Sequence, residues 1–330
     1  MKYRKLGKTE IRVSTVSFGC WAIIGGFNWG HQEKKDSLDA LSAAFDSGIN
    51  FFDTAESYGN GYSEQLIAEA LGKKRDQIII ASKASPPHFT KEKLRQACER
   101  SLRNLHTDYM DLYQLHWPNW DLPVQETLET LEQLKKEGKI RAFGVSNFGP
   151  QDLKECLEAD FKICSNQMAY SLLFRAVEYE VLSLCKDNHI SILCYSPIMQ
   201  GLLTGKFNSI EEVPEDRQRT RHFSPSRAEA RHKEEGAEKE TMEAVARIRK
   251  ISEDAEISMT SLSIAWLLSQ PSVTTAIVGG RNASQVKENA RAGDVELAPE
   301  IKERLSHATE KLKKKLGRNL DMWESSSRIR

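Results

Sequence analysis

Residues 49–53, Ile-Asn-Phe-Phe-Asp, set a pattern for this chain, because a short apolar run ends there in an ionisable residue. The pattern recurs at residues 78–83, which end in Lys83, and at residues 112–116, which end in His116. Short apolar runs of this kind are typical of parallel strands that are covered on both faces. In a closed parallel barrel, catalytic groups gather at the carboxyl ends of the strands. The repeated ending therefore predicts a barrel with an active site at one end.

Segments with helical apolar spacing alternate with the strand-like runs. The predicted strands lie near residues 13–18, 49–52, 78–82, 110–115, 140–145, 162–166, 190–194 and 274–278. Strict alternation predicts parallel pairing through right-handed crossovers. Eight such units in about 250 residues indicate an α/β fold, the (β/α)8 or TIM barrel. A doubly wound open sheet is the alternative, but the first loop, residues 19–26, lacks the G-x-G-x-x-G pattern of that fold.

Three segments fall outside the eight units of a single domain that we place at residues 1–330. Residues 1–12 are expected to form a β-hairpin around Gly-Lys-Thr. Residues 207–236 are highly charged and predict a long loop after the seventh strand, with the role of a lid. Residues 299–330 predict a C-terminal amphipathic helix, to residue 315, followed by a polar tail from residue 317.

The composition narrows the class of protein. Lys plus Arg and Asp plus Glu both number 47, so the net charge is zero and nothing suggests a nucleic-acid partner. No apolar run approaches the roughly 20 residues that span a bilayer, and the N-terminus lacks the apolar core of a signal peptide. The six cysteines lack the spacing of a metal site or a disulfide framework. We expect a cytoplasmic protein with reduced cysteines, no metal and no membrane partner.

The residues at the strand ends form a set that is suited to proton transfer. Asp53 and Lys83 follow neighbouring strands and predict an ion pair. Tyr58 lies in the loop above the same strand as Asp53, and a nearby ammonium is expected to lower its pKa from about 10. Tyr58 is thus a candidate general acid, and His116 is a candidate donor to a substrate oxygen. This set suits carbonyl reduction, which requires a nicotinamide as the source of hydride.

The same residues resemble a known family. Residues 52–59, Phe-Asp-Thr-Ala-Glu-Ser-Tyr-Gly, resemble the aldo-keto reductase motif D-T-A-x-x-Y-G. Lys83, His116 in Leu-His-Trp-Pro, and residues 144–148, Gly-Val-Ser-Asn-Phe, match further motifs in the expected order. The resemblance covers residues 3–295 and is greatest to the bacterial branch of general-stress and inositol-locus reductases. This branch is also similar to potassium-channel β-subunits.

The resemblance implies roles for individual residues. The catalytic tetrad would be Asp53, Tyr58, Lys83 and His116. The nicotinamide would be held by Ser146, Asn147, Gln167 and Tyr195. The pyrophosphate stretch would supply Ser196, Ile198, Gly201, Leu202 and Lys206. The adenosine pocket would comprise Gly279, Gly280, Arg281, Gln285, Glu288 and Asn289.

The adenosine end departs from the family pattern. Many relatives carry Lys-Ser where this chain has Gly279 and Gly280, and Arg where it has Gln285. In those relatives the cations select the 2′-phosphate of NADPH. Arg281 is a candidate replacement, because guanidinium groups suit phosphate. We therefore expect NADPH as the cofactor, with NADH as the open alternative.

Aromatic residues in the loops indicate the wall that faces the substrate. The loops above the strands contain Trp21, Trp29, Trp117 and Trp120. Several aromatics on an active face predict an apolar substrate wall. We expect Trp21 and Trp117 to contact the substrate.

The long loop also carries three closely spaced arginines, Arg217, Arg219 and Arg221. Their placement in a highly charged stretch favours a solvated position. The alternative is a lid that closes over the pyrophosphate of the cofactor.

The preferred interpretation is an NADPH-dependent reductase of a small aldehyde or ketone, which also runs in reverse as an alcohol dehydrogenase. A lyase that forms a Schiff base at Lys83 is a second interpretation, although pairing with Asp53 argues against it. A non-catalytic nucleotide sensor, as the channel-subunit similarity allows, is the third. The substrate's identity and the oligomeric state are not predicted, since analogy of fold does not transfer specificity.

Overall fold

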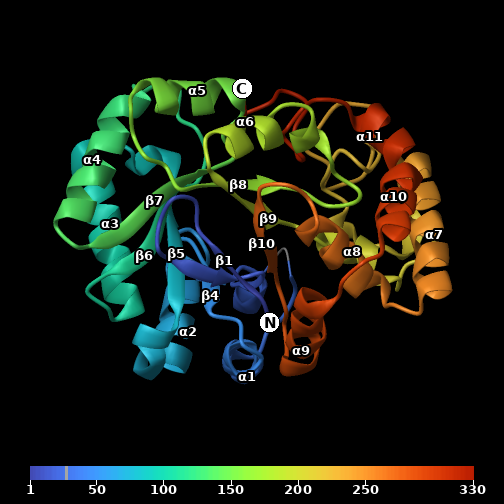
Figure 1. Cartoon of the computed structure of the whole chain (residues 1–330), viewed down its shortest axis with the longest axis horizontal. Coiled ribbons are helices and arrows are strands. Elements are labelled where there is room, and N and C mark those ends of the chain that lie inside the picture. Colours follow the sequence, from blue (N-terminus) through green and yellow to red (C-terminus); the bar gives the residue numbers. More distant parts are fainter. Residues whose placement is uncertain (27–28) are drawn as a thin grey trace.

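The computed structural model describes residues 1–26 and 29–330, which form a closed parallel barrel surrounded by helices (Figure 1). The barrel strands are β3 (Val16–Gly19), β4 (Phe51–Asp53), β5 (Ile79–Ala84), β6 (Met110–Leu115), β7 (Ile140–Ser146), β8 (Ser165–Ala169), β9 (Ser191–Tyr195) and β10 (Val273–Val278). They follow one another in sequence order, and β10 closes the ring against β3. The predicted (β/α)8 fold is confirmed.

The helices cover the outside of the barrel. They are α1 (Lys34–Asp46), α2 (Tyr62–Leu71), α3 (Lys91–Leu105), α4 (Val124–Lys136), α5 (Pro150–Glu158), α6 (Val181–Asp187), α7 (Glu238–Ala255), α8 (Met259–Leu268) and α9 (Ala283–Arg291). Most have one apolar face, as in α3, where Leu94, Cys98 and Leu102 are buried. By contrast, α8 is buried along its whole length, and its first turn is capped by the Ser258 side chain.

The bounds of most predicted strands shift by one or two residues, and two strands differ from the prediction by three residues at one end or both. The run at residues 13–18 serves two sheets: β2 (Arg12–Ser14) pairs antiparallel with β1 (Tyr3–Lys5), and β3 starts only at Val16. The hairpin turns apolar side chains, Leu6 among them, into the bottom of the barrel. The strand predicted at residues 162–166 is wrong by three residues at each end, since β8 spans Ser165–Ala169. The strand includes buried polar residues, which an apolar pattern does not detect.

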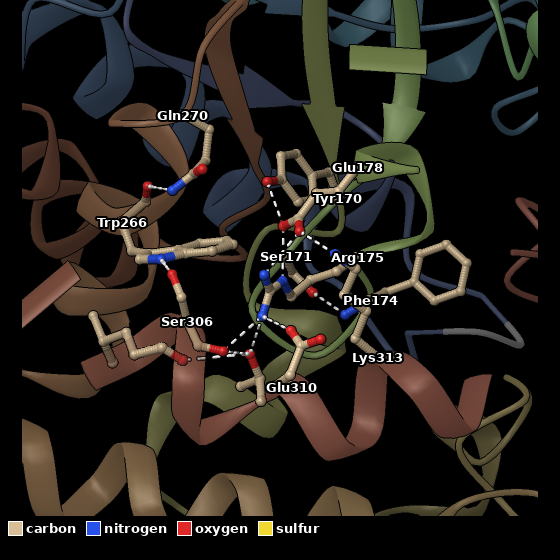
Figure 2. A network of polar contacts seen from close by, with 12 residues as sticks. Tyr170, Ser171, Phe174, Arg175, Glu178, Trp266, Gln270, Ser306, Glu310 and Lys313 are labelled. Carbon is tan, nitrogen blue, oxygen red and sulfur yellow. Dashed lines mark hydrogen bonds and ion pairs between the residues drawn. The ribbon is translucent and has the colours of Figure 1, made fainter. Parts of the chain in front are cut away.

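The predicted C-terminal helix is two helices, α10 (Pro299–Ala308) and α11 (Glu310–Leu316). Figure 2 shows the buried network that holds this junction. Arg175 donates to the carbonyl oxygen of Ser306 at 2.7 Å and to Thr309 Oγ1 at 3.0 Å. Its Nε lies 2.7 Å from a carboxylate oxygen of Glu178, which also pairs with Lys313 of α11 at 2.8 Å. Charge-assisted bonds therefore attach both helices to the loop after β8.

The C-terminal tail packs on the barrel. Met322, Trp323 and Ile329 are buried. The carbonyl oxygen of Arg330 accepts hydrogen bonds from the backbone N–H groups of Gln151 and Asp152 in the first turn of α5. Backbone N–H groups in the first turn of a helix have no partner within the helix, and here the Arg330 oxygen accepts their hydrogen bonds. The tail is thereby held across the end of the barrel where the strands terminate.

The interpretation of the loop arginines as solvated is wrong for Arg219 and Arg221, which are both buried. Arg221 donates to the carbonyl oxygens of Leu316 at 2.7 Å and Asn319 at 3.1 Å. A guanidinium has five donors, which suits it to a segment that exposes several carbonyl groups. The positive charge of Arg221 thus binds carbonyl groups of the C-terminal segment and does not face solvent.

In the described part of the chain, no helix is long and apolar enough to cross a membrane.

Burial of His222 in the same loop predicts an acid-sensitive fold. Its Nε2–H donates to the carbonyl oxygen of Leu173 at 2.9 Å, and Nδ1 lies 3.0 Å from the hydroxyl of Thr220. Burial lowers the pKa of His222 from 6.5 to about 4. His222 therefore binds a proton more tightly in the unfolded chain than in the folded protein. The contribution of the neutral ring to the free energy of unfolding is fully present above pH 6.5. We expect it to be lost as the pH falls, by about 3 kcal/mol at pH 4.

Urea unfolding from pH 7 to pH 4 tests this expectation. His222→Gln keeps one donor and one acceptor without a titrating ring, so it should flatten the fall of the unfolding free energy with acid. The control is His307→Gln on the exposed face of α10, which should leave the slope unchanged. A parallel fall in the wild type and in His222→Gln would show that this histidine is not the sensitive group.

Candidate active site

A buried ion pair lies at the base of the site. Lys83 Nζ is 2.6 Å from Asp53 Oδ1 and 2.8 Å from the carbonyl oxygen of Thr54. The pair forms because β4 and β5 are adjacent and their ends lie at the same edge of the barrel. Asp53 Oδ2 also accepts from Gln167 Nε2 at 2.7 Å and from Gln114 Nε2 at 3.4 Å. Sequence reasoning missed Gln114 because it lies inside an otherwise apolar strand.

Tyr58 lies above this pair in the loop after β4. The Lys83 ammonium is 5.1 Å from the centroid of the Tyr58 ring. The expectation that Lys83 lowers the tyrosine pKa below its ordinary value is wrong. Burial has the largest effect and raises the pKa of Tyr58, and Asp53 raises it further, so the opposing effect of Lys83 is outweighed. The phenol therefore keeps its proton at neutral pH, as a proton donor must.

His116 follows β6 and faces the same space. Its ring centroid lies 5.9 Å from that of Tyr58, with the two planes at 75°. Although the ring faces the cavity, surrounding protein atoms desolvate it, and this burial together with the charge of Lys83 lowers the pKa of His116 to about 3. The imidazole is neutral at physiological pH. It can therefore donate one hydrogen bond to a substrate oxygen without carrying a charge of its own.

One cavity of about 740 Å3 extends from these residues to the end of β10. Of the predicted site residues, its walls contain Trp21, Asp53, Tyr58, His116, Trp117, Ser146, Asn147, Gln167, Tyr195, Ser196, Ile198, Gly201, Lys206, Gly279, Gly280, Arg281, Gln285, Glu288 and Asn289. Two do not line it: Lys83 lies beneath Tyr58 and Asp53, and Leu202 is buried behind the wall. The site residues predicted from distant parts of the sequence thus come together.

Buried polar groups form a platform on β7, β8 and the end of β9. Ser146 Oγ donates to the carbonyl oxygen of Gln167 at 3.0 Å, and the Tyr195 hydroxyl donates to Asn147 Oδ1 at 2.8 Å. Asn147 Nδ2 also donates to the carbonyl oxygen of His116 at 3.0 Å. These bonds fix the orientation of the side chains beside the tetrad. Because Gln167 bonds Asp53, it also links the platform to the ion pair.

The turn after β9 brings two cationic side chains together beside a glycine. Gly201 has φ of +100°, and a Cβ atom there would lie 3.3 Å from Lys206 Cε and 3.5 Å from Arg217 Nη1. Burial, followed by the charge of Arg217, lowers the pKa of Lys206. Two cations therefore converge on a space that the missing side chain leaves open. A pyrophosphate fits this arrangement, since it would relieve the repulsion between them.

The end of β10 carries the predicted adenosine residues. A Cβ atom on Gly280 would lie 2.6 Å from Val286 Cγ2, so close packing requires glycine there. Arg281 Nε donates to Gln32 Oε1 at 2.8 Å, and its carbonyl oxygen accepts from Gln32 Nε2 at 2.9 Å. The Arg281 backbone N–H donates to Gln285 Oε1 at 2.9 Å. This guanidinium is thus positioned at the cavity wall by the loop that precedes α1.

Trp29 of the expected aromatic wall lines the cavity, as do Arg217 and Arg219 of the long loop, for which a position over the pyrophosphate was the alternative interpretation. The sequence did not assign four further lining residues, which are Arg231, Thr260, Trp323 and Arg328. Arg328 lies over the Trp117 ring, with its guanidinium carbon 4.1 Å from the centroid, and it pairs with Asp321 at 2.7 Å. Trp120 is outside the cavity, contrary to the aromatic wall expected from the sequence, because its Nε1 bonds Asp152. The described residues include no group of three His, Cys, Asp or Glu side chains placed to hold a metal.

Proteins of similar sequence share most of this chain. Aldo-keto reductase YhdN of Bacillus subtilis (strain 168) is 35% identical over 297 residues, which cover 87% of each chain. The NADH-specific methylglyoxal reductase of Escherichia coli (strain K12) is 32% identical, with 90% of this chain and 95% of that protein covered. A probable voltage-gated potassium channel subunit beta of Arabidopsis thaliana is 29% identical, with 89% and 92% covered.

Solved structures and a family profile agree with these similarities. An aldo-keto reductase of Klebsiella pneumoniae in complex with NADPH has a TM-score of 0.73 and 28% identity to this chain. That match covers 93% of this chain and 95% of the other. The profile of the aldo/keto reductase family matches residues 15–310. The chain therefore belongs to the aldo/keto reductase family of oxidoreductases.

Proposed function

We propose that this protein reduces an aldehyde or ketone to an alcohol with NADPH, reversibly. The observation that carries the proposal is the geometry at one end of the cavity. A protonated Tyr58 and a neutral His116 face the same space above the buried ion pair of Lys83 and Asp53. Such a site can give a proton to a carbonyl oxygen while a second donor orients that oxygen.

The cofactor, when bound, supplies the hydride that no side chain can provide. Tyr58 gives its proton to the carbonyl oxygen. Lys83 then stabilises the phenolate that remains, since its ammonium is held beside the ring by Asp53. His116 donates to the same oxygen and directs the carbonyl group toward Tyr58. The indole of Trp21 stacks on Tyr58, with centroids 6.0 Å apart and planes at 21°, and limits the access of water.

Three parts of the cavity are proposed to hold the dinucleotide. The buried amides and hydroxyls of Ser146 and Asn147 suit the carboxamide of the nicotinamide. Lys206 and Arg217 converge beside Gly201 and suit the pyrophosphate. Arg281 supplies a cation for the 2′-phosphate, which favours NADPH. The Klebsiella relative in complex with NADPH supports this choice, whereas the NADH-specific E. coli relative keeps NADH as the alternative.

The Schiff-base interpretation has less support. Burial alone would lower the pKa of Lys83, but Asp53 and Tyr58 together raise it above its ordinary value. A lysine nucleophile needs the neutral amine, so an ammonium held by a buried carboxylate is poorly suited to that role. The non-catalytic sensor would use the same cofactor residues and is distinguished only by an absence of turnover.

Binding and turnover together test the proposed function. Titration with NADPH and with NADH is followed by quenching of tryptophan fluorescence, to which Trp21 and Trp29 beside the cavity contribute. NADPH is expected to bind at least tenfold more tightly than NADH, and Arg281→Ala should remove most of that difference. NADPH oxidation is then measured with a panel of aldehydes and ketones. NADPH binding without any turnover would favour the sensor, and no binding of either nucleotide would reject both.

A further inference from the structure

The loop between β4 and α2 forms a wall between two cavities. Tyr58 lines the active-site cavity, whereas Glu56, two residues earlier, lines a smaller polar cavity of about 380 Å3. Ser57 lines both. The Glu56 side chain is 10% exposed, so its carboxylate is largely withdrawn from water. Because Glu56 does not line the active-site cavity, any effect that it has on the reaction must pass through the loop.

Both oxygens of the Glu56 carboxylate bind other segments of the chain. Oε1 accepts from the backbone N–H of Ser85 at 2.8 Å and lies 2.7 Å from His88 Nδ1. Oε2 accepts from Arg100 Nη2 of α3 at 3.1 Å. The backbone N–H of Glu56 also donates to the carbonyl oxygen of Lys83, at 3.3 Å. One residue thus joins the loop after β4 to the end of β5 and to α3.

The sequence explains why the Ser85 amide binds this carboxylate. Ser85 follows β5 and precedes Pro86 and Pro87, which have no N–H group. A residue before proline favours an extended backbone, and Ser85 has φ of −83° and ψ of 149°. Its N–H is therefore the last backbone donor before the two prolines, and the bond to a carboxylate is charge-assisted. Without Glu56 this amide would lose its acceptor.

The segment at residues 83–85, which Glu56 binds, also holds the other proposed catalytic groups. Its first residue is Lys83. The carbonyl oxygen of its second residue accepts from the backbone N–H of His116 at 2.9 Å. A shift of the loop relative to this segment would therefore move Tyr58 against both groups.

We propose that Glu56 is a positioning residue for Tyr58. The ends of the loop have another anchor, because Thr54 Oγ1 donates to Ser63 Oγ at 2.8 Å. Glu56 attaches the middle of the loop and so maintains the 5.1 Å between the Tyr58 ring centroid and the Lys83 ammonium. A displacement of about 1 Å in a reacting group costs up to about 100-fold in rate. The inference rests on the proposed function for the rates that it predicts.

Three substitutions of Glu56 separate its reach from its charge. Glu56→Gln keeps the length and an acceptor for Ser85, so the rate of NADPH oxidation in a single turnover should fall by less than about threefold. Glu56→Asp keeps the charge but is one methylene shorter and cannot reach Ser85 and Arg100 together, and Glu56→Ala has no acceptor. Both should be slower by about 10- to 100-fold. The Kd for NADPH should stay within about twofold in all three, because the cations beside Gly201 are unchanged.

A second ion pair on α3 supplies the control. Glu137 pairs with Arg95 of that helix, both side chains are under one-third exposed, and Glu137 lines neither cavity. Glu137→Ala should lower stability in urea without changing the rate. If loss of an ion pair on α3 acted only through stability, Glu137→Ala and Glu56→Ala would slow the reaction alike, and that outcome would overturn the inference. Glu56→Asp keeps the charge in the cavity, so it tests the inference even if Glu56→Ala does not fold.

Fluorine NMR of protein labelled with 3-fluorotyrosine follows Tyr58 without turnover. The chain has eight tyrosines, and the Tyr58 resonance is the one that Tyr58→Phe removes. We expect this resonance to shift or broaden in Glu56→Asp and Glu56→Ala and to match the wild type in Glu56→Gln and Glu137→Ala. That result would support the inference even if no aldehyde were reduced, an outcome that would reject only the proposed function. An unchanged resonance in Glu56→Asp and Glu56→Ala, an equal change in Glu56→Gln, or an equal loss of rate and of NADPH affinity would each overturn it.

Discussion

Tyr58→Phe is expected to lower kcat by about 10²- to 10⁴-fold, the usual contribution of a positioned general acid. The Kd for NADPH should stay within about twofold of the wild-type value. The hydroxyl is the only group that the substitution removes, and Tyr58 lines the cavity with His116, whereas the cations beside Gly201 that are proposed to hold the pyrophosphate are unchanged. Stopped-flow measurement of NADPH oxidation gives the first quantity, and fluorescence titration gives the second.

A tyrosine nearby in the chain supplies the control. Tyr62 starts α2 and is exposed by 37%, so Tyr62→Phe should change neither quantity. The pH–rate profile adds a second criterion. His116, with a pKa of about 3, should contribute no ionisation between pH 5 and pH 8 in either protein. An equal loss of turnover and of NADPH affinity in Tyr58→Phe would assign the tyrosine to cofactor binding.

The strand ends show why much of this site could be predicted from the sequence. In a parallel barrel the strand termini share one edge, so Asp53, Lys83 and His116 had to converge once the fold was inferred. Their residue types then determined the chemistry. The ion pair at 2.6 Å is what two opposite charges on neighbouring strands are expected to form. The convergence of these residues and the ion pair depend on the local sequence and on the order of the strands, and both can be predicted from a single sequence.

Two features depended on tertiary contacts that the sequence does not contain. The direction of the Tyr58 pKa follows from desolvation, and desolvation depends on the walls that surround the ring, Trp21 among them. The second feature is the part that the tail plays in the cavity. Trp323 forms part of the cavity wall because Arg175 and Arg221 hold the C-terminal segment in place. No local sequence pattern predicts these contacts.

The arginines of the long loop illustrate the same limit. Alternating arginines in a charged stretch are usually solvated, and the sequence interpretation followed that rule. In the structure, Arg221 binds carbonyl groups of the tail and Arg219 lies between two indoles. Both contacts join segments about 100 residues or more apart in the sequence, so burial of these charges depends on the completed fold.

Lys83→Met is expected to have the largest effect on stability, a loss of about 3 to 5 kcal/mol in the free energy of unfolding. The substitution leaves the carboxylate of Asp53 in the barrel interior, where both side chains of the pair are almost fully buried. Hydrogen bonds from Gln167 and Gln114 remain, but they do not carry a positive charge. Urea unfolding measures the loss, and Arg318→Met in an exposed pair with Glu180 should cost under about 1 kcal/mol.

The double variant Asp53→Asn/Lys83→Met separates stability from catalysis. It removes both charges, keeps an acceptor for the Gln167 amide, and should therefore recover most of the stability that Lys83→Met loses. Turnover should not recover, because no ammonium is left beside Tyr58 to stabilise the phenolate that forms when the proton is given up. If the double variant were as unstable as Lys83→Met, the cost would come from lost packing of the lysine stem. If it regained activity, the ion pair would have only a structural role, and Tyr58 would not need Lys83 to release its proton.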